Sequence, residues 1–211
     1  LSADLGKLWT MERVLFKPYC CCAVIHPAID GLKKLIAAWS LTVNDIVKIE
    51  VCYGKGYVDH ARIATPHDLL EMQFSTSFSL ALALLRGRNT PGEYTMGAMN
   101  DPKVRAAASR VHVQEEAQLG EQFQGHMSAR VRVQTRSGSV YEELVVDAKG
   151  SPEAPLSSAE IDDKFRLQVV DVFGVERCEK LLGVLRNVIA LDDMTQLAAM
   201  LVREKGEMSG E

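Results

Sequence analysis

The 211-residue chain has 47% hydrophobic and 25% charged residues, a composition typical of a globular protein that buries its own core. Its formal net charge of -4 excludes a general electrostatic attraction to nucleic acid or to an anionic membrane surface. The sequence contains no apolar run long enough to cross a bilayer and no secretory signal, so we expect neither a membrane nor a nucleic-acid partner.

The cysteines indicate a reducing compartment. Three of the five are adjacent, at residues 20–22, which is not the spacing of a secreted disulfide framework. We therefore expect a cytoplasmic protein. Adjacent side chains point in different directions, and only Cys52 and Cys178 remain to complete a ligand set, so we expect no metal site. A first residue that is Leu1 and not methionine is compatible with a fragment or a processed piece.

Helical periodicity dominates the first forty residues. Residues 1–14 are predicted to form a short helical lead-in with Leu5, Leu8 and Trp9 on its buried side. A longer helix is predicted from Pro27 to about Ser40, because proline suits the first helical turn, where its missing N–H has no helical partner. Its apolar face is formed by side chains that recur at helical spacing: Ile29, Leu32, Leu35, Ile36 and Trp39.

Alternating apolar and polar residues predict four strands. They begin near Ile46, Val111, Ala129 and Val140, and the last two form a β-hairpin. Between and after them, helices are predicted over residues 68–86 and 101–110, from residues 157–158, and over residues 175–189 and 194–203. This succession of elements is typical of an α+β fold with a small antiparallel sheet.

Three arginines of the hairpin invite a functional interpretation. Alternation places Arg130, Arg132 and Arg136 on one face, where an anion could bind. Glu142 is available on the opposite strand to neutralise them, so a solvated outer face is the better interpretation.

The segment before the first long helix carries the most chemistry. His26 falls at or next to the N-cap, where the positive end of the helix dipole makes an imidazole harder to protonate. Near pH 7 a neutral imidazole can act as a base or a hydrogen-bond donor, and Lys17 just upstream can hold a negative group beside it. The pair predicts a site that binds a carboxylate and moves a proton next to it. The structural alternative is a surface lysine and a helix cap.

Several motifs in order resemble the second half of the MmgE/PrpD family, which includes 2-methylcitrate dehydratase, cis-aconitate decarboxylase and iminodisuccinate epimerase. They are KPY at 17–19 with HPAID at 26–30, DIVKIEV at 45–51, MQFS at 72–75 with ALALLRG at 81–87, DPKV at 101–104, and KGSP at 149–152 with PLS at 155–157 and KFR at 164–166. The resemblance covers most of the chain.

This resemblance implies a domain organisation. Residues 1–150 would form an α+β lid-like domain with helices packed on one face of its sheet, and this domain would carry the active-site segment. Residues 151–211 would add C-terminal helices that pack against an all-helical domain or a partner chain. In the family, that helical domain comes from the first half of the polypeptide and supplies further catalytic residues. We therefore expect either a homodimer or a heteromer with a chain that provides the helical half.

The resemblance also implies a function: a cofactor-independent lyase or isomerase, similar to 2-methylcitrate dehydratase, that acts on a small di- or tricarboxylate. Proton transfer α to a carboxylate would be the central step. Lys17 and His26 would be catalytic, the first by binding the substrate carboxylate and the second as acid/base. The substrate-binding residues would be Tyr19, Cys22, Gln73 and Ser75.

Two positions depart from the family pattern. Cys22 stands where cis-aconitate decarboxylases carry a second histidine, and Phe78 stands where many relatives have tyrosine. The missing histidine weighs against decarboxylation, and a proton-transfer or carboxylate-binding role of the tyrosine does not carry over to Phe78. Two alternatives to an enzyme therefore stay open: a non-catalytic lid-like subunit or fragment that completes a separate helical catalytic chain, and an α+β ligand-binding module unrelated to the family.

Overall fold

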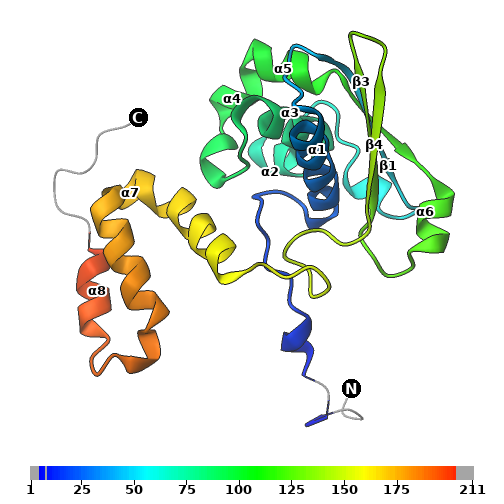
Figure 1. The fold of residues 1–211 in the computed structure, drawn as a ribbon. Coiled ribbons are helices and arrows are strands. Elements are labelled where there is room, and N and C mark those ends of the chain that lie inside the picture. Colours follow the sequence, from blue (N-terminus) through cyan, green and yellow to red (C-terminus); the bar gives the residue numbers. More distant parts are fainter. Residues whose placement is uncertain (1–4, 8, 203–211) are drawn as a thin grey trace. The chain divides into compact units, whose positions relative to one another are not determined.

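The computed structural model describes residues 5–7 and 9–202, with only the backbone of His60, and the chain divides into two compact units (Figure 1). Unit 1 is Leu1–Leu156 and unit 2 is Ser157–Glu211. Unit 1 combines a sheet with helices, whereas unit 2 is helical. The α+β fold class predicted from the sequence is confirmed.

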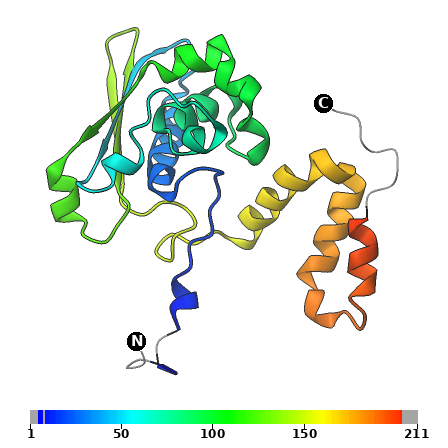
Figure 2. The ribbon, with the colours of Figure 1, turned by 180° about the vertical axis from the view of Figure 1, so that it is seen from behind.

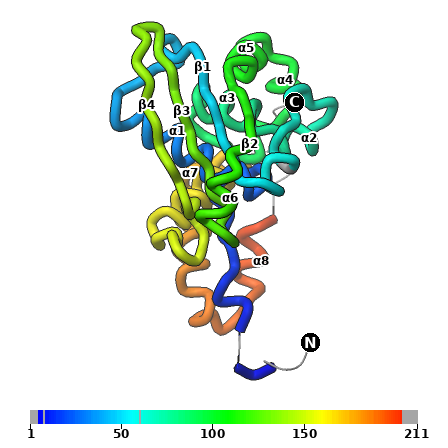
Figure 3. The backbone as a smooth tube through the Cα atoms, turned by 90° about the vertical axis from the view of Figure 1, so that its right-hand side faces the viewer, coloured from blue at the N-terminus to red at the C-terminus, as the bar shows by residue number. Residues whose placement is uncertain are grey.

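Unit 1 is built on a four-stranded sheet in the order β2-β1-β3-β4, which Figure 3 shows from the side. Its strands are β1 (Ile46–Tyr53), β2 (Val111–Glu115), β3 (Ala129–Thr135) and β4 (Val140–Val145). β3 pairs antiparallel with both β1 and β4, but β2 pairs parallel with β1, so the sheet is mixed and not purely antiparallel. The long helical connection between β1 and β2 makes this parallel crossover possible.

Most helices of unit 1 cover one face of this sheet, as Figures 1 and 2 show from opposite sides. They are α1 (His26–Trp39), α2 (Leu69–Gln73), α3 (Thr76–Arg86), α4 (Met96–Asn100) and α5 (Pro102–Ala108). Helix α6 (Ala117–Gln122) lies apart from them and packs against Gly54, just after β1. Short 3-10 turns are η1 (Thr10–Arg13), η2 (Ala23–Ile25), η3 (Val58–His60) and η4 (Pro91–Glu93).

The helix predicted over residues 68–86 is divided into α2 and α3. The break lies at Ser75, whose backbone is extended and whose Oγ accepts a hydrogen bond from the Phe78 N–H at 3.3 Å. A serine whose side chain caps a new helix stops the preceding one, because it satisfies an amide that a continuous helix would have used. The apolar periodicity of residues 68–86 does not predict this break.

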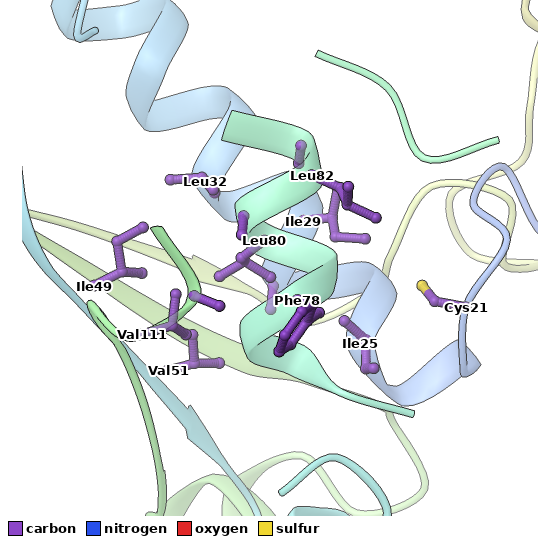
Figure 4. Packing of buried hydrophobic residues seen from close by; sticks show 14 of the residues in the cluster. Cys21, Ile25, Ile29, Leu32, Ile49, Val51, Phe78, Leu80, Leu82 and Val111 are labelled. Atoms are coloured by element: carbon purple, nitrogen blue, oxygen red, sulfur yellow. The ribbon is translucent and has the colours of Figure 1, made fainter. Parts of the chain in front are cut away.

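Helix α1 packs against both the sheet and α3. Ile29 and Leu32 are fully buried and lie among Leu80, Ile49 and the other core residues in Figure 4. At Gly31 the helix approaches the sheet so closely that an added Cβ would lie 2.9 Å from Val131 Cγ2. Trp39, at the end of the predicted apolar face, is 56% exposed and stacks on Tyr141 with ring centroids 4.3 Å apart.

The prediction of a helical lead-in over residues 1–14 is wrong for the residues that the structure describes. Thr10–Arg13 form one 3-10 turn, and Leu5 and Trp9 are 84% and 65% exposed. Leu8 lies outside the described residues. The apolar side chains stay exposed because no described element covers them.

The outer face of the sheet carries an ion-pair network. Glu142 accepts hydrogen bonds from Arg130 at 2.7 Å and from Arg132 at 2.5 Å, and these two arginines also pair with Glu116 and Glu50. The pairing of the arginines with Glu142 across the hairpin is confirmed. With each guanidinium neutralised by carboxylates, this face does not offer a free anion-binding patch.

Unit 2 contains α7 (Ser158–Arg186), η5 (Val188–Ala190) and α8 (Thr195–Leu201). A capping box between Ser157 and Glu160 starts α7, and Gly174 interrupts it with a φ of 73° and a ψ of 166°. Arg166 pairs with Glu179 across this interruption. The interruption explains why the sequence predicts a new helix from Val175. Among the described residues, every helix falls short of the combination of length and apolarity that a membrane crossing requires.

The close approach at Gly31 leads to a stability prediction. Gly31→Ala should lower the free energy of unfolding by about 1–3 kcal/mol, since the new methyl group overpacks the contact with Val131. Gly183→Ala is the matched control: it also lies inside a helix, but an added Cβ meets no atom within 4 Å. This control should stabilise α7 by about 0.5–1 kcal/mol through helix propensity. Calorimetric unfolding of both variants checks the opposite signs; destabilisation of equal size in both would contradict the close packing.

Candidate active site

The segment of residues 16–22 crosses the surface of unit 1 and is held there by backbone hydrogen bonds to three separate parts of the chain. Phe16 N donates to Gly150 O at 2.9 Å, Cys20 N to Asn89 O at 2.8 Å, and Cys22 N to Gln73 O at 2.9 Å. These bonds bring the KPY motif, the end of α2 and the KGSP motif together, although they are far apart in sequence.

His26 is the first residue of α1, next to its N-cap Ile25, and its side chain is fully buried. Neither ring nitrogen has a hydrogen-bond partner among the described residues. Burial, with a smaller contribution from the positive charge of Lys17, lowers the pKa of His26 from 6.5 to about 4, and backbone groups of Cys21 and Tyr19 oppose the shift. His26 is therefore neutral at pH 7, as the sequence predicted, but burial is the main cause.

Lys17 is exposed, and its charge acts on the pKa values of both His26 and Cys21, so it lies within electrostatic reach of both. The two hollows that we describe in unit 1, of about 360 Å³ and 380 Å³, have neither Lys17 nor His26 in their walls. The structure thus places a cation near a buried neutral imidazole. That the two side chains share one substrate cavity stays a prediction.

Tyr19 links this segment to α1. Its hydroxyl donates to Asp30 Oδ1 at 2.6 Å, and its ring meets His26 edge-on with centroids 5.2 Å apart. The other oxygen of Asp30 accepts from Lys149 N at 2.7 Å, and Lys33 Nζ lies 4.8 Å from the Tyr19 ring centre. Sequence reasoning missed the role of Asp30, although its place in HPAID, four residues after His26 on the same helix, was a usable signal.

The other predicted substrate-binding residues surround the cysteines. Gln73 Nε2 donates to Cys20 Sγ at 3.4 Å, and Cys22 is half-buried, with its backbone bound to Gln73. Ser75 is fully buried and its oxygen caps α3. The contacts of Gln73 and Ser75 organise the segment, and direct contact of these residues with a substrate stays a prediction.

A buried polar cluster beside Cys21 was not predicted. Tyr94 OH donates to Ser79 Oγ at 3.0 Å, and Asn89 Nδ2 donates to the Ser79 carbonyl at 2.9 Å and to Tyr94 OH at 3.2 Å. Burial raises the pKa of the Cys21 thiol to about 12, although hydrogen bonds from Tyr94 and Ser79 oppose the shift. Cys21 is therefore an uncharged thiol and a poor nucleophile. No local sequence pattern links residues 21, 79, 89 and 94.

In the described parts of the chain, no three His, Cys, Asp or Glu side chains are grouped to hold a metal ion, and the five cysteines are free.

The lowered pKa of His26 predicts a pH dependence of stability. The unfolded chain binds a proton at this histidine below about pH 6.5, whereas the folded chain binds it only below about 4. The free energy of unfolding should therefore fall by about 3 kcal/mol as the pH drops across this window. His26→Gln should flatten this part of the profile. NMR titration should show His26 neutral at pH 5.5 and His126 protonated, because Asp147 raises the pKa of His126; protonation of His26 at pH 5.5 would contradict its burial.

The anchoring of Phe16 predicts a second stability effect. At Gly150 the φ is +90° and an added Cβ would lie 2.0 Å from Phe16 O, so Gly150→Ala should displace the Lys17 segment. Gly138→Ala is the control, since its φ is +85° but no atom lies within 4 Å. Gly138→Ala should lower the free energy of unfolding by about 1–2 kcal/mol through backbone strain alone. Urea denaturation should show that Gly150→Ala lowers the free energy of unfolding more than Gly138→Ala does, and proteolysis near Lys17 should increase only in Gly150→Ala. Equal decreases in the free energy of unfolding would contradict the proposed role of the Phe16–Gly150 contact.

Comparison with known proteins identifies the family of the chain. The family model described as the MmgE/PrpD C-terminal domain matches residues 19–188. The cis-aconitate decarboxylase of Aspergillus terreus is 22% identical over 94% of this chain and 42% of that protein. This chain thus spans less than half the length of that relative. The family match begins at Tyr19, two residues after Lys17, and covers His26, the sheet and α7, so the chain belongs to the MmgE/PrpD family.

Proposed function

We propose that this chain is the lid-like part of a lyase or isomerase that acts on a small di- or tricarboxylate by proton transfer α to a carboxylate, as 2-methylcitrate dehydratase does. Family membership and the similarity to a cis-aconitate decarboxylase support this class of reaction. A complete site would also need residues from the helical half of the family.

The observation that carries the proposal is the state of His26. Buried polar atoms nearly always have hydrogen-bond partners, yet both nitrogens of this imidazole have none among the described residues. Its pKa of about 4 keeps it neutral at pH 7, so it can accept a proton at one nitrogen and donate from the other. A substrate, or a residue of the helical half, would supply the missing partners.

Lys17 would perform the electrostatic part of the reaction. Removal of a proton α to a carboxylate builds negative charge on that carboxylate, and a cation fixed beside it lowers the barrier. Lys17 is exposed on a segment held by the hydrogen bonds of Phe16, Cys20 and Cys22, so its backbone is restrained while its ammonium group can reach a ligand. His26 would then exchange the proton at the neighbouring carbon.

The substrate-binding residues would act mainly by positioning. The hydroxyl of Tyr19 already donates to Asp30, so in our proposal its ring orients His26. Gln73 would hold Cys20 and Cys22 in place, and Ser75 would position the first turn of α3.

Dehydration or isomerisation is favoured over decarboxylation. Cys22 replaces the second histidine of the decarboxylases, and Phe78, 3% exposed within the core, offers no hydroxyl where many relatives have tyrosine. A site without these two groups retains one base and one cation. His26 would take the α-proton, and the imidazolium so formed would return it to the hydroxyl group, which leaves as water while the carbon–carbon double bond forms.

A second candidate is a non-catalytic subunit that completes a helical chain. The exposed apolar side chains of unit 2 favour it: Ile161, Leu167, Val175, Ile189, Met194 and Leu201 are each at least 45% exposed, and Ile189 is 99% exposed. Apolar exposure on this scale is typical of a surface that packs on another domain or chain. Activity of the assembled protein separates the two candidates.

The proposal predicts that Lys17→Ala abolishes turnover of 2-methylcitrate or cis-aconitate while the fold stays intact. The assay uses the whole natural polypeptide, or this chain together with a helical half of the family, and product formation is followed by ultraviolet absorbance. The turnover number should fall by about 10³-fold or more, because the lost cation would stabilise negative charge in the transition state.

Lys55→Ala is the control, since Lys55 is equally exposed in unit 1 but lies in the loop after β1. Circular dichroism verifies folding of both variants. Wild-type turnover in Lys17→Ala would remove the proposed site, and an assembled wild-type protein without activity on any di- or tricarboxylate would favour the non-catalytic subunit.

A further inference from the structure

A hollow of about 380 Å³ lies between the start of α3, the end of α5 and the edge strand β2. Its polar wall is formed by Thr65, Ser77, Arg105, Ser109 and His112, and Phe78 lies beside them. The volume is that of a small-molecule site. None of the residues in its wall is acidic, so Arg105 makes the hollow positively charged.

Ser77 is the second residue of α3 and is only 6% exposed, yet its hydroxyl has no hydrogen-bond partner among the described residues. The amides on either side are used: Thr76 N donates to Ala61 O at 3.3 Å and Phe78 N to Ser75 Oγ at 3.3 Å. The Ser77 N–H has no such partner in the described chain. Ser77, in the first turn of an eleven-residue helix, therefore brings to the wall of the hollow a hydroxyl and an amide that have no partner among the described residues.

Arg105 is held in place at the opposite wall. Its Nε donates to Met99 O at 3.1 Å, while its two terminal amino groups make no hydrogen bond within the described residues. Thr65 adds a hydroxyl that is likewise unpaired there. The hydroxyl of Ser109 already donates to Ala106 O at 3.0 Å, so it contributes polarity and no donor. The unpaired groups are thus mostly hydrogen-bond donors, and the site requires an acceptor with negative charge.

This hollow is separate from the Lys17 and His26 region. Ser77 and Ser79 are two residues apart on α3, which places them about 200° apart around the helix axis. Ser79 contacts Tyr94 and the Cys21 cluster, so Ser77 faces the other side of the helix. Arg105 belongs to α5, and the hydrogen bond that it makes among the described residues goes to Met99 O and not to a residue of the candidate active site.

We infer that this hollow is a second binding site, for an oxyanion group of a small molecule, either a carboxylate or a phosphate. The Ser77 amide and hydroxyl bind one side of the oxyanion, and the Arg105 guanidinium binds the other. The inference goes beyond the proposed function and does not depend on it, since neither Ser77 nor Arg105, the two residues that would bind the oxyanion, is assigned to the proton-transfer site.

The test is an NMR titration of the ¹⁵N-labelled chain with sodium phosphate and, separately, with citrate at constant ionic strength. Saturable shifts of the Ser77 amide and the Arg105 side-chain signals are expected with at least one anion. Binding of phosphate alone identifies a phosphate group, binding of citrate alone a carboxylate, and binding of both a general oxyanion site; all three support the inference. The absence of saturable shifts with either anion overturns it.

Variants test the residues. Arg105→Gln should weaken binding about tenfold through loss of a charge-assisted hydrogen bond, and Ser77→Ala should weaken it about threefold or more. Lys103→Gln is the matched control, because it removes the same charge from an exposed position of α5 outside the hollow. Lys17→Ala should leave this binding unchanged. Circular dichroism verifies each fold, and Ser77→Ala decides the outcome if Arg105→Gln does not fold.

Two results would contradict the site. Equal weakening by Lys103→Gln and Arg105→Gln would show that anions respond only to net charge. Loss of binding in Lys17→Ala, with retention in Arg105→Gln and Ser77→Ala, would place the anion at the proposed active site. That result would overturn the second site and support the first, so the two proposals fail separately.

Discussion

The burial of the first turn of α1 determines the chemistry of the candidate active site. Gly31 lets the helix approach Val131 of the sheet, and α3 covers the helix from another side. At the start of this packed helix the side chain of His26 is fully buried, with the Tyr19 ring against it. The imidazole therefore loses the solvation that would stabilise its charged form. Without this packing, His26 would be an ordinary helix-terminal histidine. Lys17 adds to the effect, because its charge opposes a second positive charge nearby.

The same packing places the supporting residues. Asp30 lies one turn after His26 on α1, and its two oxygens bind the Tyr19 hydroxyl and the Lys149 amide. A single carboxylate thereby joins the segment before α1 to the loop after β4. Hydrogen bonds of this kind, made by residues that support the reactive groups, hold those groups in a fixed geometry. Proton transfer requires such a geometry.

Helix α3 connects two polar regions of unit 1. Ser79 on one side belongs to the buried cluster with Tyr94 and Asn89, and Ser77 on the other side borders the hollow with Arg105. The serines that interrupt the apolar sequence of this helix thus have different surroundings. Small polar side chains allow close packing on the first side and leave room for a ligand on the second.

Much of the local structure followed from the sequence alone. Periodicity placed α1, β1, the β3–β4 hairpin and the helix from Val175, and the ordered motifs identified the MmgE/PrpD family. Because these features are determined by residues that are close together in the sequence, local sequence patterns predict them. The choice of Lys17 and His26 as the central pair also came from local position, before a helix, together with the family resemblance.

The tertiary structure alone decided the rest. The parallel pairing of β2, the break at Ser75, the exposure of Trp9 and the clusters around Asp30, Tyr94 and Ser77 all depend on residues distant in sequence. The pKa of His26 belongs to this group, because desolvation is a property of the packed environment and not of the residue. Sequence pattern determines which elements form, whereas the contacts between them determine which polar groups are paired, buried or left to bind a ligand.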